Sequence, residues 1–197
     1  MKRLIKAAIA GILTLAGCND FPDFLKADSY SVGMNVRRVK GRWKAFHVGK
    51  EVPYFRIQGN KKLDENLDIY LRGDFTSREF QERSYSVDVD IRGDMQSLGT
   101  GISFYPFKQR ELSLDAGVEA FHANVTAIGE KFNFSARVED SVYGYGANVG
   151  VSYNHKIKDN LSFVASGGYN FTDTSTERTA FDFDGPYGFV GLKLTLP

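Results

Sequence analysis

Hydrophobic and polar positions alternate along most of this chain with a period of two. Residues 161–170 show the pattern clearly. There, apolar or small side chains alternate with mostly polar or small ones: Leu161, Phe163, Ala165, Gly167 and Tyr169 against Ser162, Val164, Ser166, Gly168 and Asn170. Successive side chains of a β-strand point to opposite faces, so this alternation predicts a strand with one apolar face and one more polar face.

The same pattern recurs about eight times. It predicts strands over residues 29–39, 52–61, 67–76, 95–107, 112–123, 143–157, 161–172 and 186–196. Most of these segments have the roughly 9–11 residues that a tilted strand needs to cross a bilayer. We therefore expect an all-β fold, an eight-stranded antiparallel up-and-down transmembrane β-barrel.

The predicted connections alternate in length. Short turns are expected at residues 62–66, 108–111 and 158–160, and long connections at 40–51, 77–94, 124–142 and 173–185. Such alternation is typical of barrels in the outer membrane of Gram-negative bacteria, where periplasmic turns are tight and outer loops are long.

The N-terminus predicts an export signal. Lys2, Arg3 and Lys6 precede a short apolar stretch over residues 7–16, which is too short to span a membrane as a helix. The stretch ends in Leu15-Ala16-Gly17-Cys18, which resembles the lipobox of bacterial lipoproteins. That resemblance implies cleavage before Cys18 and acylation of this residue; an ordinary signal peptide with an incidental cysteine is the alternative. We expect a signal peptide over residues 1–17, a lipidated tether over 18–28 and a barrel over 29–197.

Composition narrows the function classes. The chain has 25 basic and 24 acidic residues without one long basic block, so no nucleic-acid partner is expected. Cys18 is the only cysteine, which excludes an internal disulfide. Twenty glycines, ten tyrosines and sixteen phenylalanines suit a barrel of short, regular strands.

The alternation assigns faces to the charged residues. The outward candidates include Val32, Leu71, Leu98, Leu114 and Val149, and none of the candidates is charged, as expected for side chains that meet lipid. Charges on the inward face are Arg37, Arg56, Arg72 and Lys193 with Asp68, Asp74, Asp115 and Glu119. An eight-stranded barrel is only wide enough to be filled by side chains, and an unpaired buried ion is costly. We therefore predict an ion-pair network that closes the lumen; the alternative is that some of these charges are solvated near the rims.

Over residues 29–197 this pattern resembles the small eight-stranded outer-membrane barrels of the outer-membrane protein A and opacity-protein type. The resemblance implies a non-enzymatic, porin-like membrane protein with structural, surface-interaction or adhesion-like duties. It also implies a monomer in contact with outer-membrane lipid and lipopolysaccharide, with a host or cell-surface partner reached by the loops. Two features depart from the family: the chain ends in Leu194-Thr195-Leu196-Pro197 instead of an aromatic residue, and its N-terminus looks lipidated.

Candidate chemistry is sparse. His47, His122 and His155 lack metal-ligand spacing, so neither a metal nor another cofactor is expected. His122 with Glu130 and Ser135 could mimic the Ser-His-Glu set of lipid A deacylases, but Asn124 stands where the serine would be. A lipid A-modifying esterase is therefore the least favoured alternative. The second predicted long loop contains Glu82, Asp88, Asp90 and Asp94. Their carboxylates could bind calcium, or they could form an acidic loop exposed to solvent.

Aromatic residues beside basic ones mark the predicted long loops. They are Arg42, Trp43, Lys44 and Phe46, then Lys131, Phe132 and Phe134, then Phe181 and Phe183. They could contact lipopolysaccharide phosphates or a host partner, or they could anchor the barrel at the membrane interface.

A soluble alternative also exists. Gly41-Arg42-Trp43 matches the G-x-W element of lipocalins, which are eight-stranded barrels with an apolar ligand-binding interior, and some bacterial members are lipidated. A lipocalin would need a soluble exterior and a late helix. This chain shows no late helical pattern, and the G-x-W element falls in a predicted loop.

Overall fold

The structure is a computed structural model of the chain. It describes the backbone of residues 27–43, 46–84, 87–131, 134–175, 180–182 and 184–196, and the side chains of 27–37, 52–76, 94–124, 141–173 and 184–196. Structural statements below concern these residues. In this part of the chain no helix is long and apolar enough to cross a membrane.

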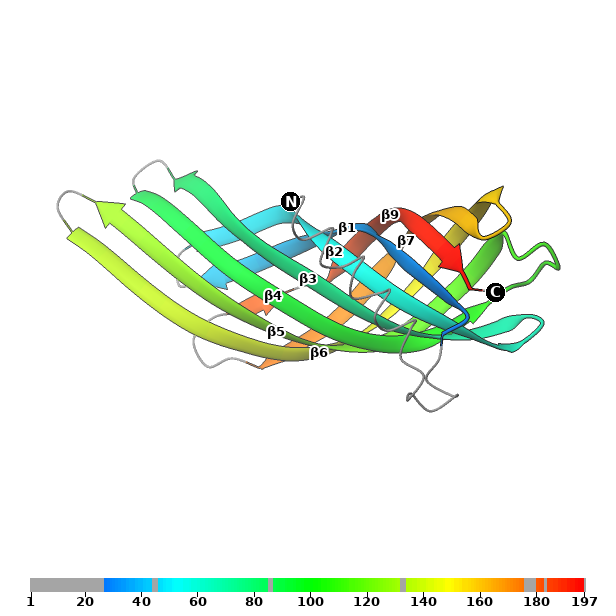
Figure 1. The fold of residues 1–197 in the computed structure, drawn as a ribbon. Coiled ribbons are helices and arrows are strands. Elements are labelled where there is room, and N and C mark those ends of the chain that lie inside the picture. The colour runs from blue at the N-terminus through cyan, green and yellow to red at the C-terminus, as the bar shows by residue number, and fades with distance from the viewer. Residues whose placement is uncertain are drawn as a thin grey trace, which may run out of the picture.

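The strands form one closed antiparallel sheet (Figure 1). They are β1 (Ser29–Trp43), β2 (Phe46–Asp64), β3 (Leu67–Ser84), β4 (Val87–Phe104), β5 (Leu112–Lys131), β6 (Phe134–Lys158), β7 (Leu161–Ser175), β8 (Ala180–Asp182) and β9 (Gly185–Thr195). Each long strand pairs with its neighbour in sequence, and β9 pairs with both β7 and β1, which closes the barrel. The short β8 pairs with β1 beyond the end of β9, so β8 and β9 together complete the eighth position. The predicted eight-stranded antiparallel barrel is confirmed.

The predicted long connections are wrong in extent, because most of their residues are strand. β3 and β4 remain paired up to Ser84 and Val87, β5 and β6 up to Lys131 and Phe134, and β1 and β2 up to Trp43 and Phe46. In the fourth connection, β7 runs on to Ser175 and β8 follows. Over residues 77–84 the backbone pairing continues where the apolar alternation stops, so the side-chain pattern underestimates this strand. Figure 1 shows β3 to β6 projecting together beyond the other strands.

The opposite end of the barrel carries the predicted short turns. The structure places them close to the expected positions, except that β4 ends at Phe104 and not at residue 107. The turn that follows β4 contains Arg110, whose φ of 55° is unusual for a residue with a side chain. We call this end of the barrel the turn end.

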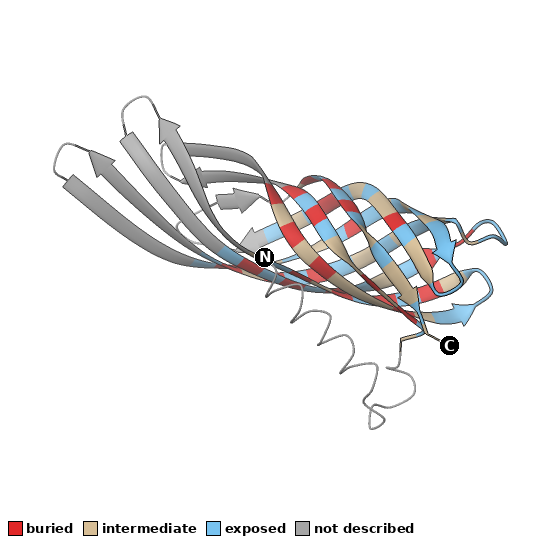
Figure 2. Ribbon diagram, turned by 45° about the horizontal axis from the view of Figure 1, so that its top comes forward, coloured by how far each residue is buried: buried red, intermediate tan, exposed pale blue. Residues whose placement is uncertain are grey.

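Burial alternates along each strand between the lumen and the outer wall (Figure 2). The outer wall carries most of the exposed large hydrophobic side chains, among them Met34, Leu71, Leu98, Ile102, Leu114, Val118, Tyr145, Val149, Val190 and Leu192. The lumen is tightly filled. Tyr70 lies across Gly101 and Gly117, where an added Cβ would come within 2.4 and 2.2 Å of its hydroxyl oxygen.

Candidate functional site: the charged lumen

Five charged side chains meet in the middle of the lumen, and we call them the central network: Arg37 of β1, Arg56 of β2, Arg72 and Asp74 of β3, and Glu119 of β5. Arg37 Nη2 lies 2.7 Å from Asp74 Oδ2, and Arg37 Nη1 lies 2.7 Å from Glu119 Oε1. Arg56 Nε lies 2.6 Å from Asp74 Oδ1, and Arg72 Nη2 lies 2.7 Å from Glu119 Oε2. Every one of these residues is at most 4% exposed.

Each carboxylate of the central network is shared between two guanidinium groups. Asp74 accepts hydrogen bonds from Arg37 and Arg56, and Glu119 accepts them from Arg37 and Arg72. Charge-assisted and bidentate contacts of this kind are short and hold their partners in a fixed geometry. The network therefore ties β1, β2, β3 and β5 together across the lumen, on strands that are not all neighbours in the sheet.

Neutral side chains complete the surroundings of the network. Arg72 Nη1 donates to Asn148 Oδ1 at 3.1 Å, and the guanidinium of Arg56 lies over the rings of Tyr187 and Phe189 at 5.7 and 5.4 Å. A polar cavity of about 30 Å³ lies beside Arg56, Arg72 and Asp115. Its size would admit roughly two water molecules.

The remaining predicted lumen charges lie nearer the turn end. Asp68 forms an ion pair with Arg110, whose guanidinium also lies 4.0 Å from the ring centroid of Tyr105. Asp115 accepts hydrogen bonds from Ser113 at 3.1 Å and from Ser152. Lys193 is half-buried on β9, outside the central network. Arg110 was not among the predicted residues, because it belongs to a turn and reaches the lumen from the end of the barrel.

The turn end also holds a buried phenol. Tyr105 follows the last residue of β4 and is 3% exposed. Burial raises the pKa of Tyr105 above its ordinary value, and the nearby carboxylate of Asp68 acts in the same direction. Tyr105 therefore stays a neutral phenol at physiological pH, with its ring against Arg110.

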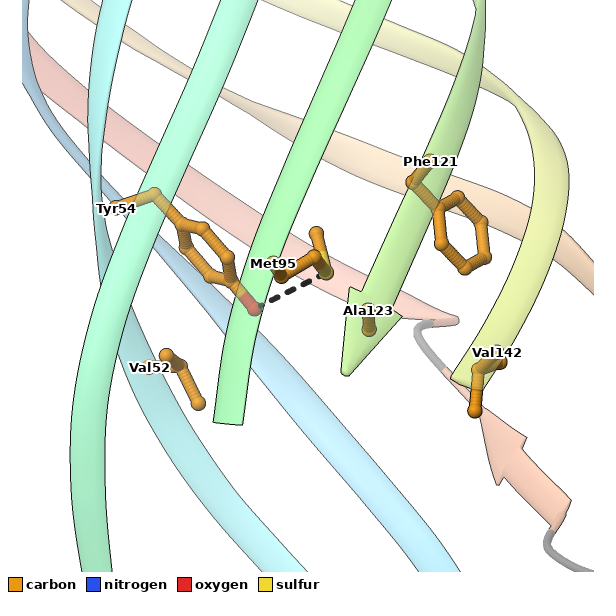
Figure 3. Close-up of a cluster of buried hydrophobic side chains, with 6 residues drawn as sticks. All are labelled: Val52, Tyr54, Met95, Phe121, Ala123 and Val142. Atoms are coloured by element: carbon orange, nitrogen blue, oxygen red, sulfur yellow. Dashed lines mark hydrogen bonds between the residues drawn. The ribbon is translucent and has the colours of Figure 1, made fainter. Parts of the chain in front are cut away.

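An apolar layer covers the central network on the side away from the turn end. Its six buried residues are Val52, Tyr54, Met95, Phe121, Ala123 and Val142 (Figure 3). Phe121 is the next inward residue after Glu119 on β5, and Tyr54 is the next inward residue beyond Arg56 on β2. The Tyr54 hydroxyl lies 3.7 Å from the Met95 sulfur, and the Tyr54 ring lies 5.7 Å from the Arg37 guanidinium carbon. Sequence analysis missed this layer, although its apolar residues fall on inward positions at the same end of four strands.

The predicted loop contacts lie largely on strands. Arg42 and Trp43 belong to β1, Phe46 to β2, Lys131 to β5, Phe134 to β6 and Phe181 to β8. Lys44, Phe132, Phe183 and Cys18 lie outside the described residues. Glu82 belongs to β3, and Asp88, Asp90 and Asp94 belong to β4, not to a loop. In the described residues, no group of three His, Cys, Asp or Glu side chains could hold a metal ion.

The described strands keep His122 apart from Glu130 and Ser135. His122 lies on β5 and stacks on Tyr143 at 4.4 Å between ring centroids, while His47 belongs to β2 and His155 to β6. Glu130 and Ser135 are register partners further along β5 and β6. Eight positions of strand separate residue 122 from residue 130, which is roughly 26 Å. The Ser-His-Glu arrangement considered above is therefore contradicted by the register.

The lipocalin alternative also disagrees with the structure. It requires an apolar interior and a polar exterior, but the described lumen contains the central network and the described outer wall carries the large hydrophobics. Gly41, Arg42 and Trp43 lie within β1 and not in a loop.

Comparisons with known proteins support the fold. No protein-family model and no curated protein matches the chain. Among solved structures, the Ail protein of Yersinia pestis matches with a TM-score of 0.52 and 16% identity over 86% of this chain and 99% of that one. The outer-membrane protein OprG of Pseudomonas aeruginosa has a TM-score of 0.48 and 9% identity over 86% of this chain and 96% of that one. The similarity to Ail shows that this chain has the fold of a small eight-stranded barrel.

Proposed function

We propose that this chain is a non-enzymatic integral outer-membrane β-barrel with a closed lumen, which recognises partners through its projecting hairpins. The main support for the proposal is that the barrel has apolar side chains on its outer wall and charged side chains in its lumen, the reverse of a soluble protein. Leu98 is 62% exposed and Val118 58% exposed on the outer wall, whereas Arg37 is 1% and Asp74 0% exposed inside. In water this arrangement would leave a continuous apolar surface exposed. In a bilayer the same surface meets hydrocarbon, and closed strand pairing satisfies the backbone.

The apolar belt on the outer wall has a boundary. Along β4 the outward residues Phe104, Ile102 and Leu98 give way to Gln96 and Asp94. At the same level of neighbouring strands, the Tyr145 hydroxyl donates to Asp173 at 3.0 Å, and the Ser141 hydroxyl donates to Asn124 at 2.8 Å. Tyrosines at the edge of an apolar belt are typical of a membrane interface. We take this boundary as the outer interface, with the turn end in the periplasm.

The closed lumen follows from two successive barriers. The central network fills the middle of the barrel with paired charges, and the apolar layer covers the network on its outer side. An eight-stranded barrel leaves no room for a channel beside such side chains. We therefore expect no conductance of hundreds of picosiemens in planar bilayers.

The projecting strands are the proposed recognition surface. β3 to β6 extend beyond the belt as two hairpins, and β1 with β2 forms a third. The β1–β2 hairpin carries Arg42, Trp43 and Phe46, and the β5–β6 hairpin carries Lys131 and Phe134. The chemistry of these aromatic and basic residues suits lipopolysaccharide phosphates or a host or cell-surface partner. Ail is described as an attachment invasion locus protein. For this chain, the support for an adhesion-like role is the set of hairpins that project beyond the belt.

The proposal includes the N-terminal residues. Residues 1–17 would be removed as a signal peptide, and Cys18 would carry acyl chains at the start of a tether over residues 18–28. The lipobox-like sequence Leu15-Ala16-Gly17-Cys18 supports this step. Mass spectrometry of the mature N-terminus tests it independently of the barrel.

The membrane assignment is tested by extraction and gel migration. We expect the chain to stay in the outer-membrane fraction after urea or carbonate washing, to need detergent for release, and to migrate faster on a gel when the sample is not boiled. Release as a soluble monomer once the N-terminal anchor is removed would contradict the proposal.

A further inference from the structure

An apolar groove runs across the outer wall on β6, β7, β9 and β1. It has a volume of about 520 Å³. Ala165, Gly167 and Gly188 are small outward residues of its floor, and larger outward side chains stand along its sides: Met34, Val36, Val151, Tyr153 and Val190. None of the residues that line the groove is charged. If the chain inserts as proposed above, the groove lies inside the hydrophobic belt.

The two glycines of the floor are not required by packing. Other glycines in the barrel make room for neighbours; an added Cβ at Gly150 would come within 2.3 Å of the Tyr187 hydroxyl oxygen. At Gly188 an added Cβ would meet nothing within 4 Å, and at Gly167 its nearest neighbour would be the Tyr187 carbonyl oxygen at 3.6 Å. Neither residue has a positive φ. Since glycine weakens a strand, two paired glycines without a packing role point to something outside the wall that needs the space.

Basic side chains lie at the turn end of the groove. His155 is the next outward residue after Tyr153 on β6, and the two rings stack at 6.4 Å. Lys158 follows on the same strand and is exposed; after the bulge in this pairing it is the register partner of Leu161, which precedes the outward Phe163 and Ala165 by even steps. The groove is thus an apolar slot that ends at a cationic rim.

We propose that this groove binds one acyl chain of an anionic phospholipid of the periplasmic leaflet, with the lipid phosphate at the rim of His155 and Lys158. The inference rests on the proposed membrane insertion. Basic residues beside a membrane surface attract anionic headgroups, and an apolar slot whose floor is two glycines and an alanine suits a hydrocarbon chain. A second copy fits less well, because a two-fold contact would place the same concave floor and the same basic rim against themselves.

The test compares lipids retained by the full mature chain. The protein is reconstituted in vesicles of phosphatidylcholine and phosphatidylglycerol in equal amounts, extracted in mild detergent and examined by native mass spectrometry. We expect the wild type to keep one phosphatidylglycerol. Gly188→Leu should fill the slot and reduce retention of that lipid about tenfold. The matched control is Ala120→Leu, on an exposed outward position of β5 that is not part of the groove.

The rim is tested by the double variant His155→Gln, Lys158→Gln, which should lower the preference for phosphatidylglycerol over phosphatidylcholine about tenfold. Equal retention by Gly188→Leu and wild type would overturn the proposal, as would formation of a disulfide-linked dimer by a Val190→Cys variant under mild oxidation. The same spectra give the mass of the protein with any acyl chains attached to Cys18. An acyl chain of the protein itself would therefore be distinguished from a bound phospholipid, and finding it in place of the phospholipid would contradict the proposal. Unboiled gels run in parallel show whether each variant is folded, which separates loss of the lipid site from failure of the barrel.

Discussion

The lumen and the outer wall of this barrel are built by the same strands but suit opposite surroundings. On β5, Asp115 and Glu119 face the lumen, while Leu114 and Val118, their immediate neighbours in sequence, face outward. Inside, each charge needs a specific partner at hydrogen-bond distance. Outside, each apolar side chain needs only a medium that is not water. Substitutions on the two faces should therefore differ in size, in sign and in their dependence on the bilayer.

The largest loss is expected inside, from Glu119→Gln. This change removes the carboxylate that pairs with both Arg37 and Arg72, and it leaves two buried guanidinium groups short of an anion. Removing one partner of a buried ion pair costs about 3–5 kcal/mol. The free energy of unfolding, measured by urea titration in lipid vesicles with unboiled gels, should fall by that amount. Glu111→Gln, at an exposed turn position, is the control and should leave it unchanged. A loss no larger than that of the control would mean that the central network is solvated.

A charge on the outer wall should cost somewhat less. Val149 is 49% exposed in the middle of β6, so Val149→Arg would place a guanidinium in hydrocarbon. The expected cost is about 2–4 kcal/mol in the same vesicle assay. Val149→Leu serves as the control, with little expected change. In a soluble barrel, arginine at this position would be harmless, so an unchanged or increased stability of Val149→Arg would argue against lipid contact.

Truncating a valine should distinguish the two faces directly. Val142 is 0% exposed in the apolar layer, and Val142→Ala should lower the free energy of unfolding by about 1–2 kcal/mol through lost burial. Val149→Ala, the matched outward variant, should change it far less, because lipid replaces the missing methyl groups. Planar-bilayer recordings of Val142→Ala should stay at the baseline, since the central network still fills the lumen below. An open conductance in this variant would mean that the apolar layer alone closes the barrel.

The smallest effect is expected at the exposed pair in the turn between β6 and β7. A hydrogen bond and the positive charge of Lys156 lower the pKa of Asp159. A carboxylate whose pKa is lowered in the folded state stabilises that state at pH values above the ordinary pKa of aspartate. The stabilisation is lost as the pH falls through the lowered pKa. Both side chains are in solvent, so Lys156→Ala should leave the unfolding midpoint unchanged at neutral pH within error. A clear drop at neutral pH that disappears in acid would show that this turn matters more than an exposed pair should.

The sequence predicts the apolar belt of the barrel well, because most outward residues there are apolar and most inward ones are polar. In that belt the outward residues Leu114, Val118 and Val149 are exposed, as parity predicts, and Glu119 is buried. The outer ends of β3 to β6 lie in the predicted long connections. Residues 77–84 keep strand pairing without an apolar alternation that would reveal it. Residues 134–138 do alternate, with Phe134, Ala136 and Val138 on one face, so this extension of β6 was open to prediction from the sequence.

The lumen was only partly predictable. Parity gave the inward positions of Arg37, Asp74 and Glu119, but it could not say which cation meets which anion, because that depends on the stagger of strands around the barrel. Arg110 was missed since a turn residue has no parity. The apolar layer was missed for two reasons. Inward positions such as that of Phe121 were expected to be polar, and Val142 fell in the predicted connection over residues 124–142.

The most direct test of the inverted polarity places a tryptophan on the outer wall and asks what surrounds it. In a Trp43→Phe background, the variants Leu114→Trp, within the belt, and Asn124→Trp, beyond it on the same strand, are refolded into vesicles whose lipids carry bromine on their acyl chains. Strong quenching of the tryptophan at position 114 and weak quenching at position 124 is the expected result. Equal, weak quenching at both positions, with free access to aqueous iodide, would contradict the account.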